Sequence, residues 1–354
     1  MSRFLSARFA ALEAYTPGEQ PQDMEYVKLN TNESPFPPSP EVIAAVSAAE
    51  VGKLNLYPDP ECKRLRRKLA ALYGVGEENV FLSNGSDDIL NFFFMAFCDA
   101  ERPVAFPNIS YGFYPVYAQL YNLPATVIPL REDFSLNAED YCGLHQNIVI
   151  ANPNAPTGMT IPVSDIETIV QTNPDHVVLI DEAYVDFGAE SCRGLIGQYE
   201  NLLVCQTFSK SRSMAGGRLG FALGSAGLIA DLNKIKYSTN PYNINRLTLV
   251  AAEAAVDSDA YYRENCQKIQ DNRAYTVEEL AKLGFTTLPS LANFIFTRCP
   301  GMDGGALYRE LKRRGVLVRY WNKPELQDYV RVTIGSREQM DRFLSTVRTI
   351  LKEG

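Results

Sequence analysis

Short apolar runs recur along the first two thirds of the chain, and helix-like amphipathic stretches separate several of them. The runs predict strands over 79–82, 103–107, 125–130, 146–151, 176–180, 202–206 and 219–223. The stretches predict helices over 42–51, 62–73, 89–97, 137–143 and 228–237, and one that ends near Tyr121. This alternation predicts an α/β fold whose mainly parallel sheet is covered on both faces and binds ligands beyond its carboxyl-terminal strand ends.

The last third of the chain lacks the regular alternation of strands and helices. A long helix is predicted over 246–283, followed by strands over 293–297, 316–320 and 330–334 and helices over 305–314 and 337–351. We expect an N-terminal arm (1–34), a large domain (35–245) and a smaller α+β domain (246–354) that packs with the arm. Within the arm, Phe4, Leu5, Phe9 and Leu12 suggest a short helix over 1–12, and the prolines of 28–38 predict an irregular segment.

Composition narrows the classes of function. The chain has 354 residues, of which 46% are hydrophobic and 21% charged, and a net charge of −8 with pI near 5.1. An acidic protein is a poor match for a general nucleic-acid or anionic-membrane surface, so we expect neither partner. No apolar run approaches the length of a membrane span.

The cysteines and histidines argue against metal chemistry. The seven cysteines are scattered and contain no C-x-x-C pair, as expected for free thiols in a reducing cytoplasm. The two histidines, His145 and His176, lie outside any H-E-x-x-H or G-x-S-x-G pattern. We therefore predict a cytoplasmic protein without a metal site.

The candidate chemical centre is a polar loop directly after the run 202–206. Lys210 follows Thr207 and Ser209, and Arg218 comes eight residues later beside two glycines. Hydroxyls and a guanidinium around an amine suit a phosphate cradle, and a partly desolvated lysine remains nucleophilic enough for imine chemistry. A solvated basic loop explains this stretch alone equally well.

Other polar groups follow predicted strands in the same way. Gly85, Ser86 and Asp87 open a helix, where free N–H groups and the helix dipole favour an anion, although ordinary helix capping fits too. The turn 152–158 frees the amide of Asn154 to face a ligand. A carboxylate such as Asp181, at a strand end just before Tyr184, can keep a pyridine nitrogen protonated, but it can also be a turn cap.

In the smaller predicted domain, Arg319 and Arg331 each interrupt an apolar strand. Periodicity alone allows an outward-facing arginine on an edge strand as readily as an anion-binding one. Near the other end of the chain, Asn32 lies in the irregular segment, where it either caps a turn or faces a ligand. Tyr111, at a helix start, is either a core residue or an aromatic platform.

T-F-S-K with an arginine eight residues later, N-P-N-x-P-T-G and D-E-A-Y occur here in the order of fold-type I aminotransferases, which use pyridoxal 5'-phosphate. The resemblance covers essentially the whole chain and implies a seven-stranded, mainly parallel sheet in the large domain. It implies that Lys210 forms a Schiff base with the cofactor and that Asp181, Asn154 and Tyr184 contact its ring. It further implies a stacking role for Tyr111 and phosphate contacts from Gly85, Ser86, Asp87, Thr207, Ser209, Arg218 and, across a homodimer interface, Tyr57.

Y-x-P-G-E-Q-P, L-N-T-N-E-S-P, Y-P-D-P and P-Y-N resemble histidinol-phosphate aminotransferases in particular. That resemblance implies transamination between L-histidinol phosphate and 2-oxoglutarate in histidine biosynthesis, with Asn32, Arg319 and Arg331 at the substrate. Aromatic amino acid aminotransferases and threonine-phosphate decarboxylases look similar at this level. A cofactor-binding protein without catalysis is the non-enzyme alternative.

Overall fold

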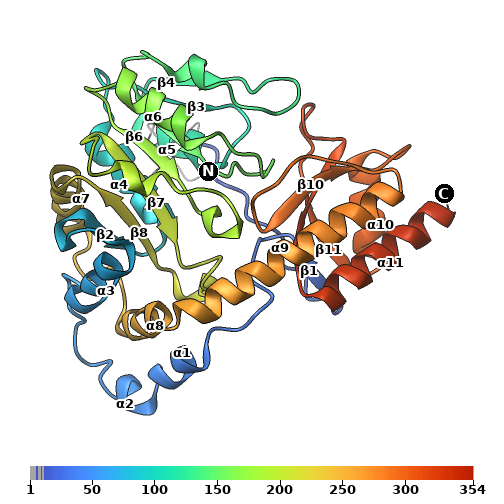
Figure 1. Cartoon of the computed structure of the whole chain (residues 1–354), viewed down its shortest axis with the longest axis horizontal. Coiled ribbons are helices and arrows are strands. Elements are labelled where there is room, and N and C mark those ends of the chain that lie inside the picture. Colours follow the sequence, from blue (N-terminus) through green and yellow to red (C-terminus); the bar gives the residue numbers. More distant parts are fainter. Residues whose placement is uncertain (1–4, 7–8, 10–11, 354) are drawn as a thin grey trace.

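Two β-sheets organise the chain in the computed structural model, which describes residues 5–6, 9 and 12–353. The larger sheet lies with its covering helices in one part of the molecule, and the smaller sheet lies with the C-terminal helices in the other (Figure 1). The predicted helix over 1–12 falls largely on residues outside the described part.

The larger sheet has seven strands in the order β2-β8-β7-β6-β5-β3-β4. Only β8 runs antiparallel to its neighbours, so the predicted mainly parallel sheet is confirmed. Most of its strands are buried apolar runs, as expected for strands covered on both faces. The strands are β2 (Val80–Ser83), β3 (Val104–Pro107), β4 (Ala125–Ile128), β5 (Asn147–Ala151), β6 (Val178–Asp181), β7 (Leu202–Thr207) and β8 (Gly220–Gly224).

Helices pack around this sheet, and local capping explains several of their ends. Gly74 ends α3 with a positive φ of 69°, and its N–H donates to the Ala70 carbonyl. Only a short helical turn, Ala138–Tyr141, forms within the predicted helix over 137–143. The α-helices of this part are α1 (Pro40–Ala45), α2 (Ala48–Val51), α3 (Lys63–Tyr73), α4 (Ser86–Phe97), α5 (Phe113–Tyr121), α6 (Val163–Thr172), α7 (Ala226–Thr239) and α8 (Arg246–Asp257).

Two predicted helices are each divided in the structure. The helix predicted over 42–51 ends at Ala45, and α2 begins after Ser47, a residue type that favours helix starts over helix interiors. The helix predicted over 246–283 is interrupted at Ser258, which separates α8 from α9 (Asp259–Lys282). The Ser258 hydroxyl donates to Glu41, so this break is tied to the start of α1.

The smaller sheet joins distant parts of the chain. Its order is β1-β11-β12-β10-β9, and β1 (Val27–Leu29) pairs parallel with β11. The sequence did not predict β1, because a three-residue strand beside the proline-rich segment carries almost no periodic signal. The other strands are β9 (Thr286–Thr287), β10 (Phe294–Arg298), β11 (Val316–Tyr320) and β12 (Tyr329–Thr333), and the helices are α10 (Gly304–Arg313) and α11 (Arg337–Glu353).

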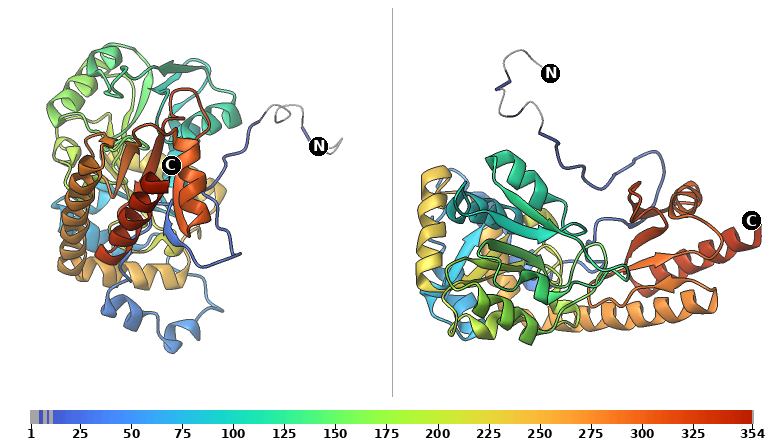
Figure 2. Two further views of the ribbon diagram at one scale, coloured as in Figure 1. Left: turned by 90° about the vertical axis from the view of Figure 1, so that its right-hand side faces the viewer. Right: turned by 90° about the horizontal axis from the view of Figure 1, so that it is seen from above.

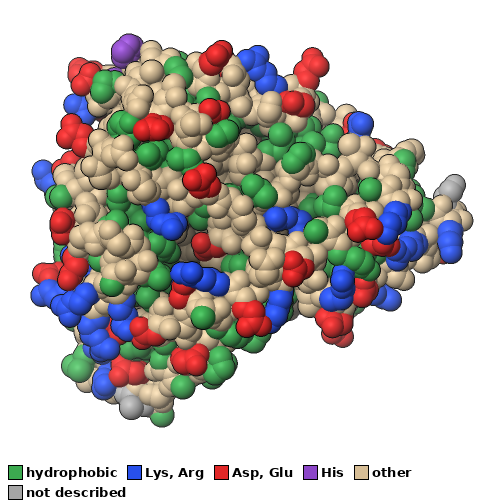
Figure 3. Space-filling model, in the orientation of Figure 1, with side chains coloured by type: hydrophobic (Ala, Val, Ile, Leu, Met, Phe, Trp, Pro, Cys, Tyr) green, Lys and Arg blue, Asp and Glu red, His purple; other side chains and the backbone are tan. Residues whose placement is uncertain are grey.

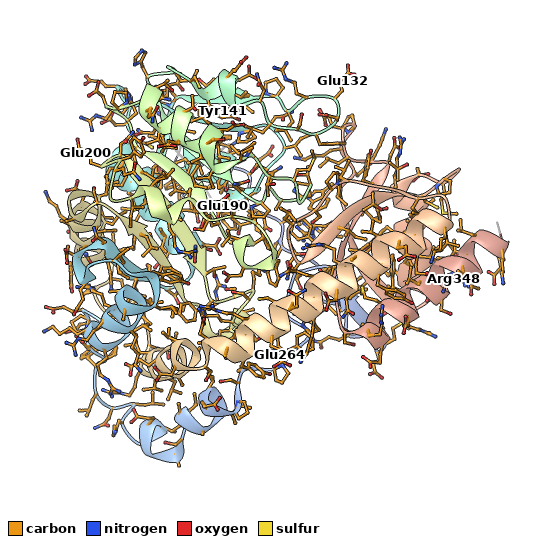
Figure 4. The ribbon with its side chains drawn as sticks, in the orientation of Figure 1. Glu132, Tyr141, Glu190, Glu200, Glu264 and Arg348 are labelled. Carbon is orange, nitrogen blue, oxygen red and sulfur yellow. The ribbon has the colours of Figure 1, made fainter. Side chains whose placement is uncertain are left out.

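The long helix α9 runs from the larger sheet's part of the molecule along the smaller sheet, beside α11 (Figure 1). Figure 4 labels Glu264 on α9 and Arg348 on α11, and the Arg348 guanidinium donates to Glu279 of α9. The segment before β1 runs between the two parts (Figure 2): Tyr15 stacks on Phe113 of α5, and β1 lies in the smaller sheet. The division into three domains stays a prediction.

Acidic and basic side chains are interspersed over the face shown in Figure 3. Among the described helices, none is long and apolar enough to cross a membrane. All seven cysteines are described, and each is a free thiol.

Candidate active site

The carboxyl ends of the parallel strands border a cavity of about 170 Å³, which we call the inner cavity. It is lined by residues that directly follow or end β2, β5, β6 and β7, including Ser86, Asp181 and Lys210. A wider cavity of about 590 Å³, the outer cavity, shares Lys210, Tyr111 and Tyr184 with it and extends to the smaller sheet. The structure therefore places a cavity where the sequence predicts the ligand site.

One end of the inner cavity is an anion cradle. No side chain caps the amino end of α4, whose N-cap residue is Gly85 with φ 89°, so the capping alternative for Ser86 and Asp87 does not hold. The positive φ of Gly85 favours glycine, and a Cβ there would lie 2.7 Å from Arg218 Nη2 and displace that guanidinium. Arg218 donates to Asp87 at 3.0 Å and to the Ser209 hydroxyl at 3.4 Å.

The hydroxyls of the Lys210 loop complete this cradle. The Thr207 hydroxyl donates to Ser209 Oγ at 3.0 Å, and both residues line the inner cavity. Together with the free N–H groups of α4, these hydroxyls and the Arg218 guanidinium form a donor set for a dianion such as a phosphate.

Asp181 ends β6 and is buried beneath the inner cavity. Its Oδ2 accepts from the Tyr114 hydroxyl at 2.9 Å, and its Oδ1 accepts from the Ala183 N–H at 3.2 Å. Burial raises the pKa of Asp181 to about 6, because the charged carboxylate loses its hydration there. The bond from the Ala183 N–H is the one expected of a turn cap. The carboxylate also lines the cavity, where a bound cation would stabilise its charge.

Lys210 stands where the two cavities meet. Its Nζ donates to the Thr31 carbonyl at 3.1 Å and lies 5.9 Å from the centre of the Tyr184 ring. Burial, helped by the positive charge of Arg331, lowers the pKa of Lys210 to about 8. A substantial neutral fraction near physiological pH makes this amine a nucleophile and a base.

The N-terminal segment supplies one wall of the site. Asn32 has a positive φ of 56°, its N–H donates to the Thr333 hydroxyl, and its side-chain amide donates to the Tyr184 hydroxyl at 3.0 Å. Asn32 is thus a link between the arm, the smaller sheet and the Tyr184 ring, rather than a turn cap alone. Burial raises the pKa of Tyr184, which keeps its hydroxyl protonated.

Arg319 and Arg331 both line the outer cavity. They lie opposite each other on β11 and β12, which are both interior strands of the sheet, so the edge-strand alternative is wrong for both arginines. The Arg319 guanidinium donates to the carbonyls of Thr16 and Pro17 at 2.9 and 3.0 Å. Arg331 donates to the Asn30 carbonyl at 3.0 Å.

Three aromatic residues line the cavities. Tyr111 lines both cavities and donates to Asp87 at 2.7 Å, which favours the platform interpretation over a core position. Tyr15 and Trp321 line the outer cavity and were not predicted as site residues. The available signals were the adjacency of Trp321, the only tryptophan, to the Arg319 strand and the place of Tyr15 at the start of the Y-x-P-G-E-Q-P motif.

Two predicted site residues are not brought to the cavities. Asn154 does not line either one: its side-chain amide donates to the Ile109 carbonyl and to Thr157, and its Oδ1 accepts from Ser110. The prediction that its amide is free to face a ligand is therefore wrong for this structure, because neighbouring loops satisfy it. Tyr57 is 78% exposed and stacks on Tyr242, away from both cavities of its own chain.

The residues of the inner cavity fit pyridoxal 5'-phosphate. The cradle at α4 suits its phosphate, and Lys210 offers the amine that its aldehyde needs. The buried carboxylate of Asp181 suits a pyridinium nitrogen. Each of these groups lines the same cavity.

Comparison with known proteins agrees with this geometry. Residues 24–347 match the model of the family "Aminotransferase class I and II". A histidinol-phosphate aminotransferase of Marinomonas sp. (strain MWYL1) is 48% identical over 353 residues, covering 99% of this chain and 100% of the relative. One of Clostridium acetobutylicum is 46% identical over 348 residues, covering 98% and 99%.

Solved structures share the fold. The histidinol-phosphate aminotransferase of Sinorhizobium meliloti in complex with pyridoxal-5'-phosphate superposes with a TM-score of 0.83 at 24% identity, covering 92% of each chain. A histidinol-phosphate aminotransferase of Clostridium acetobutylicum gives 0.85 at 23% identity, covering 92% and 99%. The chain therefore belongs to the class I and II aminotransferase family, and its predicted fold-type I architecture is confirmed.

Proposed function

We propose that this enzyme transfers the amino group of L-histidinol phosphate to 2-oxoglutarate, giving imidazole acetol phosphate and L-glutamate in histidine biosynthesis. The carrying observation is that Arg319 and Arg331 face one cavity with the Lys210 amine. Planar guanidiniums suit both the phosphate of one substrate and the carboxylates of the other. The relatives that cover this chain almost completely carry the same activity in their names.

In this proposal the inner cavity holds pyridoxal 5'-phosphate. When bound, the cofactor supplies an electron sink for the carbon that carries the substrate amine. Ser86, Thr207, Ser209 and Arg218 hold its phosphate, and Asp181 keeps its ring nitrogen protonated. Tyr111 would pack against its ring, since Tyr111 lines the inner cavity and its hydroxyl donates to Asp87.

Lys210 performs the proton transfer. Its Nζ, with a pKa lowered to about 8, accepts the proton from the amine-bearing carbon of the substrate and later returns one. Tyr184 borders the same space and keeps its orientation through Asn32. Phe294 packs edge-on against the Tyr184 ring, which restricts its rotation.

A homodimer is the second part of the proposal. Several large apolar side chains before and around Tyr57 are exposed, which is typical of a surface that another chain covers. They are Ile43, Val46, Val51, Leu54, Leu56 and Tyr242. We expect this surface to present Tyr57 to the cofactor phosphate of the partner subunit, and the seven free thiols favour the cytoplasm.

The substrate proposal is tested by the absorption of the cofactor-loaded enzyme during addition of single amines. L-histidinol phosphate should convert the cofactor to its amine form at a lower concentration than L-phenylalanine does. Preferred conversion by phenylalanine would instead favour an aromatic amino acid aminotransferase. Carbon dioxide release from O-phospho-L-threonine without any oxo acid would favour a decarboxylase, and no conversion by any amine would favour a non-catalytic binding protein.

The dimer proposal is tested by mixing two variants that should each have reduced activity, Lys210→Ala and Tyr57→Ala, under conditions of subunit exchange. If Tyr57 acts across the interface, each mixed dimer contains one site with both residues intact, and activity should return. Activity no greater than the sum of the two parents would contradict a shared site. A mixture of Lys210→Ala with the double variant serves as the control, because it restores no complete site.

A further inference from the structure

Arg319 and Arg331 are cross-strand neighbours of the same charge. The antiparallel pairing of β11 and β12 sets Arg319 directly opposite Arg331, and both line the outer cavity. Like charges directly opposite each other destabilise a sheet, so this pairing needs compensation. Neither guanidinium forms an ion pair with a carboxylate among the described residues, since their partners are the backbone carbonyls of 16, 17 and 30.

Trp321 lies against both charges. The Cζ atoms of Arg319 and Arg331 lie 5.4 and 5.2 Å from its ring centre. The negative π face of an indole attracts a guanidinium at this distance, and it is the strongest of the aromatic side chains in this respect. Arg331 has a second aromatic neighbour, Phe294, at 5.1 Å, whereas among the described residues Arg319 lies over the Trp321 ring alone.

The ring is itself held in place. Trp321 directly follows β11 and packs edge-on against Phe296 of β10, with ring centres 6.4 Å apart. The Phe296 ring is in turn stacked on Tyr329, with ring centres 4.7 Å apart. Trp321 therefore reaches both guanidiniums from a fixed position in the wall of the outer cavity.

We propose that Trp321 is a positioning residue that holds the two guanidiniums at one separation, ready to bind a single phosphate-sized anion of the substrate between them. Without the indole, mutual repulsion would move the arginines apart and each would have to be reordered by the incoming anion. This inference rests on the proposed function for the nature of the substrate, although the arginine–indole arrangement does not. Trp321 acts through the arginines and not on the reacting atoms.

The single tryptophan also provides the test, because the intrinsic tryptophan fluorescence of this chain arises from Trp321 alone. Inorganic phosphate, titrated into the cofactor-loaded enzyme at constant ionic strength, should change this fluorescence saturably, whereas chloride should not. The change should disappear in Arg331→Leu. Phosphate that competes with the amine substrate without altering the fluorescence would overturn the proposal.

Kinetics of Trp321→Leu and Trp321→Phe separate positioning from general damage. In the leucine variant KM for histidinol phosphate should rise about tenfold with kcat nearly unchanged, and phenylalanine should restore part of the loss. Tyr275→Leu is the control, because it removes a ring on α9 whose partners are Asp341 and Arg337 rather than Trp321 or the arginine pair, and its KM should stay within about twofold. Equal KM values in the tryptophan and tyrosine variants would overturn the proposal, as would a fall in kcat alone.

Failure of the substrate assignment can be distinguished from failure of the proposed role of Trp321. If histidinol phosphate is not converted, the substrate assignment fails, yet the phosphate titration of the unmodified enzyme still reports whether Trp321 senses an anion at the arginine pair. A saturable phosphate response would then support the positioning role, and its absence would reject it.

Discussion

The inner and outer cavities differ in where their residues come from and in how their charges are satisfied. The inner cavity is built mainly from the ends of adjacent strands of one sheet, and its guanidinium, Arg218, is already paired with Asp87. The outer cavity joins the N-terminal segment to the smaller sheet, and within the described part of the chain its two guanidiniums donate to backbone carbonyls and not to a carboxylate. The inner cavity is therefore suited to a cofactor that stays bound, and the outer cavity to a substrate anion that binds and leaves.

The largest effect should come from removing the amine that both cavities share. Lys210→Ala should lower turnover by at least about a thousandfold, because no other described lysine lines the inner cavity. Steady-state transamination measures this, with Lys268→Ala as the control, since Lys268 pairs with Glu264 on α9, lies over the Phe36 ring and lines neither cavity. Turnover within tenfold of the unmodified enzyme would contradict the assignment of Lys210.

The second-largest effect on activity should come from Asp181→Asn, which should lower kcat but raise the stability of the cofactor-free protein. The neutral amide cannot keep a ring nitrogen protonated, so we expect kcat to fall about a hundredfold. Burial of Asp181 raises its folded-state pKa from 3.8 to about 6, so the folded state holds the extra proton between these values and stability falls as pH rises through them.

The cofactor-free Asp181→Asn protein should therefore be more stable than its parent at pH 7.5, by about 3 kcal/mol at most. Near pH 4 the difference should shrink towards zero, because the folded-state carboxyl is then protonated. Urea unfolding at the two pH values checks this. A destabilised variant at pH 7.5 would show that the carboxylate is favourably placed even without a bound cation.

A smaller effect should appear in the pH dependence of cofactor uptake. Only neutral Lys210 attacks the aldehyde, so the rate of uptake by cofactor-free protein should rise with pH and level off above about pH 8. Arg331→Leu should move this plateau to higher pH, because Arg331 lowers the pKa of Lys210. Stopped-flow absorbance follows the reaction, and a rate still rising at pH 10 in the unmodified protein would contradict it.

The two cavities also differ in how far the sequence predicts them. Lys210, Asp181 and Ser86 lie at or just beyond the ends of recognisable apolar strands, and parallel strands bring such positions together without further information. Trp321 and Tyr15 depend on the pairing of β1 with β11, which links residues nearly three hundred positions apart. Short strands leave no periodic signal for such a pairing.

Asn154 and the divided helices show a second limit. The N-P-N-x-P-T-G turn was identified correctly, but which neighbours satisfy the Asn154 amide depends on the loop that carries Ile109 and Ser110. Similarly, the break at Ser258 is tied to its contact with Glu41 of α1, which helical periodicity cannot reveal.

The central claim is that the inner cavity holds the cofactor and the outer cavity binds the substrate phosphate. It is tested most directly by comparing L-histidinol phosphate with L-histidinol as amino donors. We predict that the unmodified enzyme prefers the phosphate ester in kcat/KM by at least about a hundredfold, and that Arg331→Leu removes most of this preference while retaining bound cofactor. A preference that survives unchanged in Arg331→Leu, or cofactor lost together with the arginine, would contradict the account.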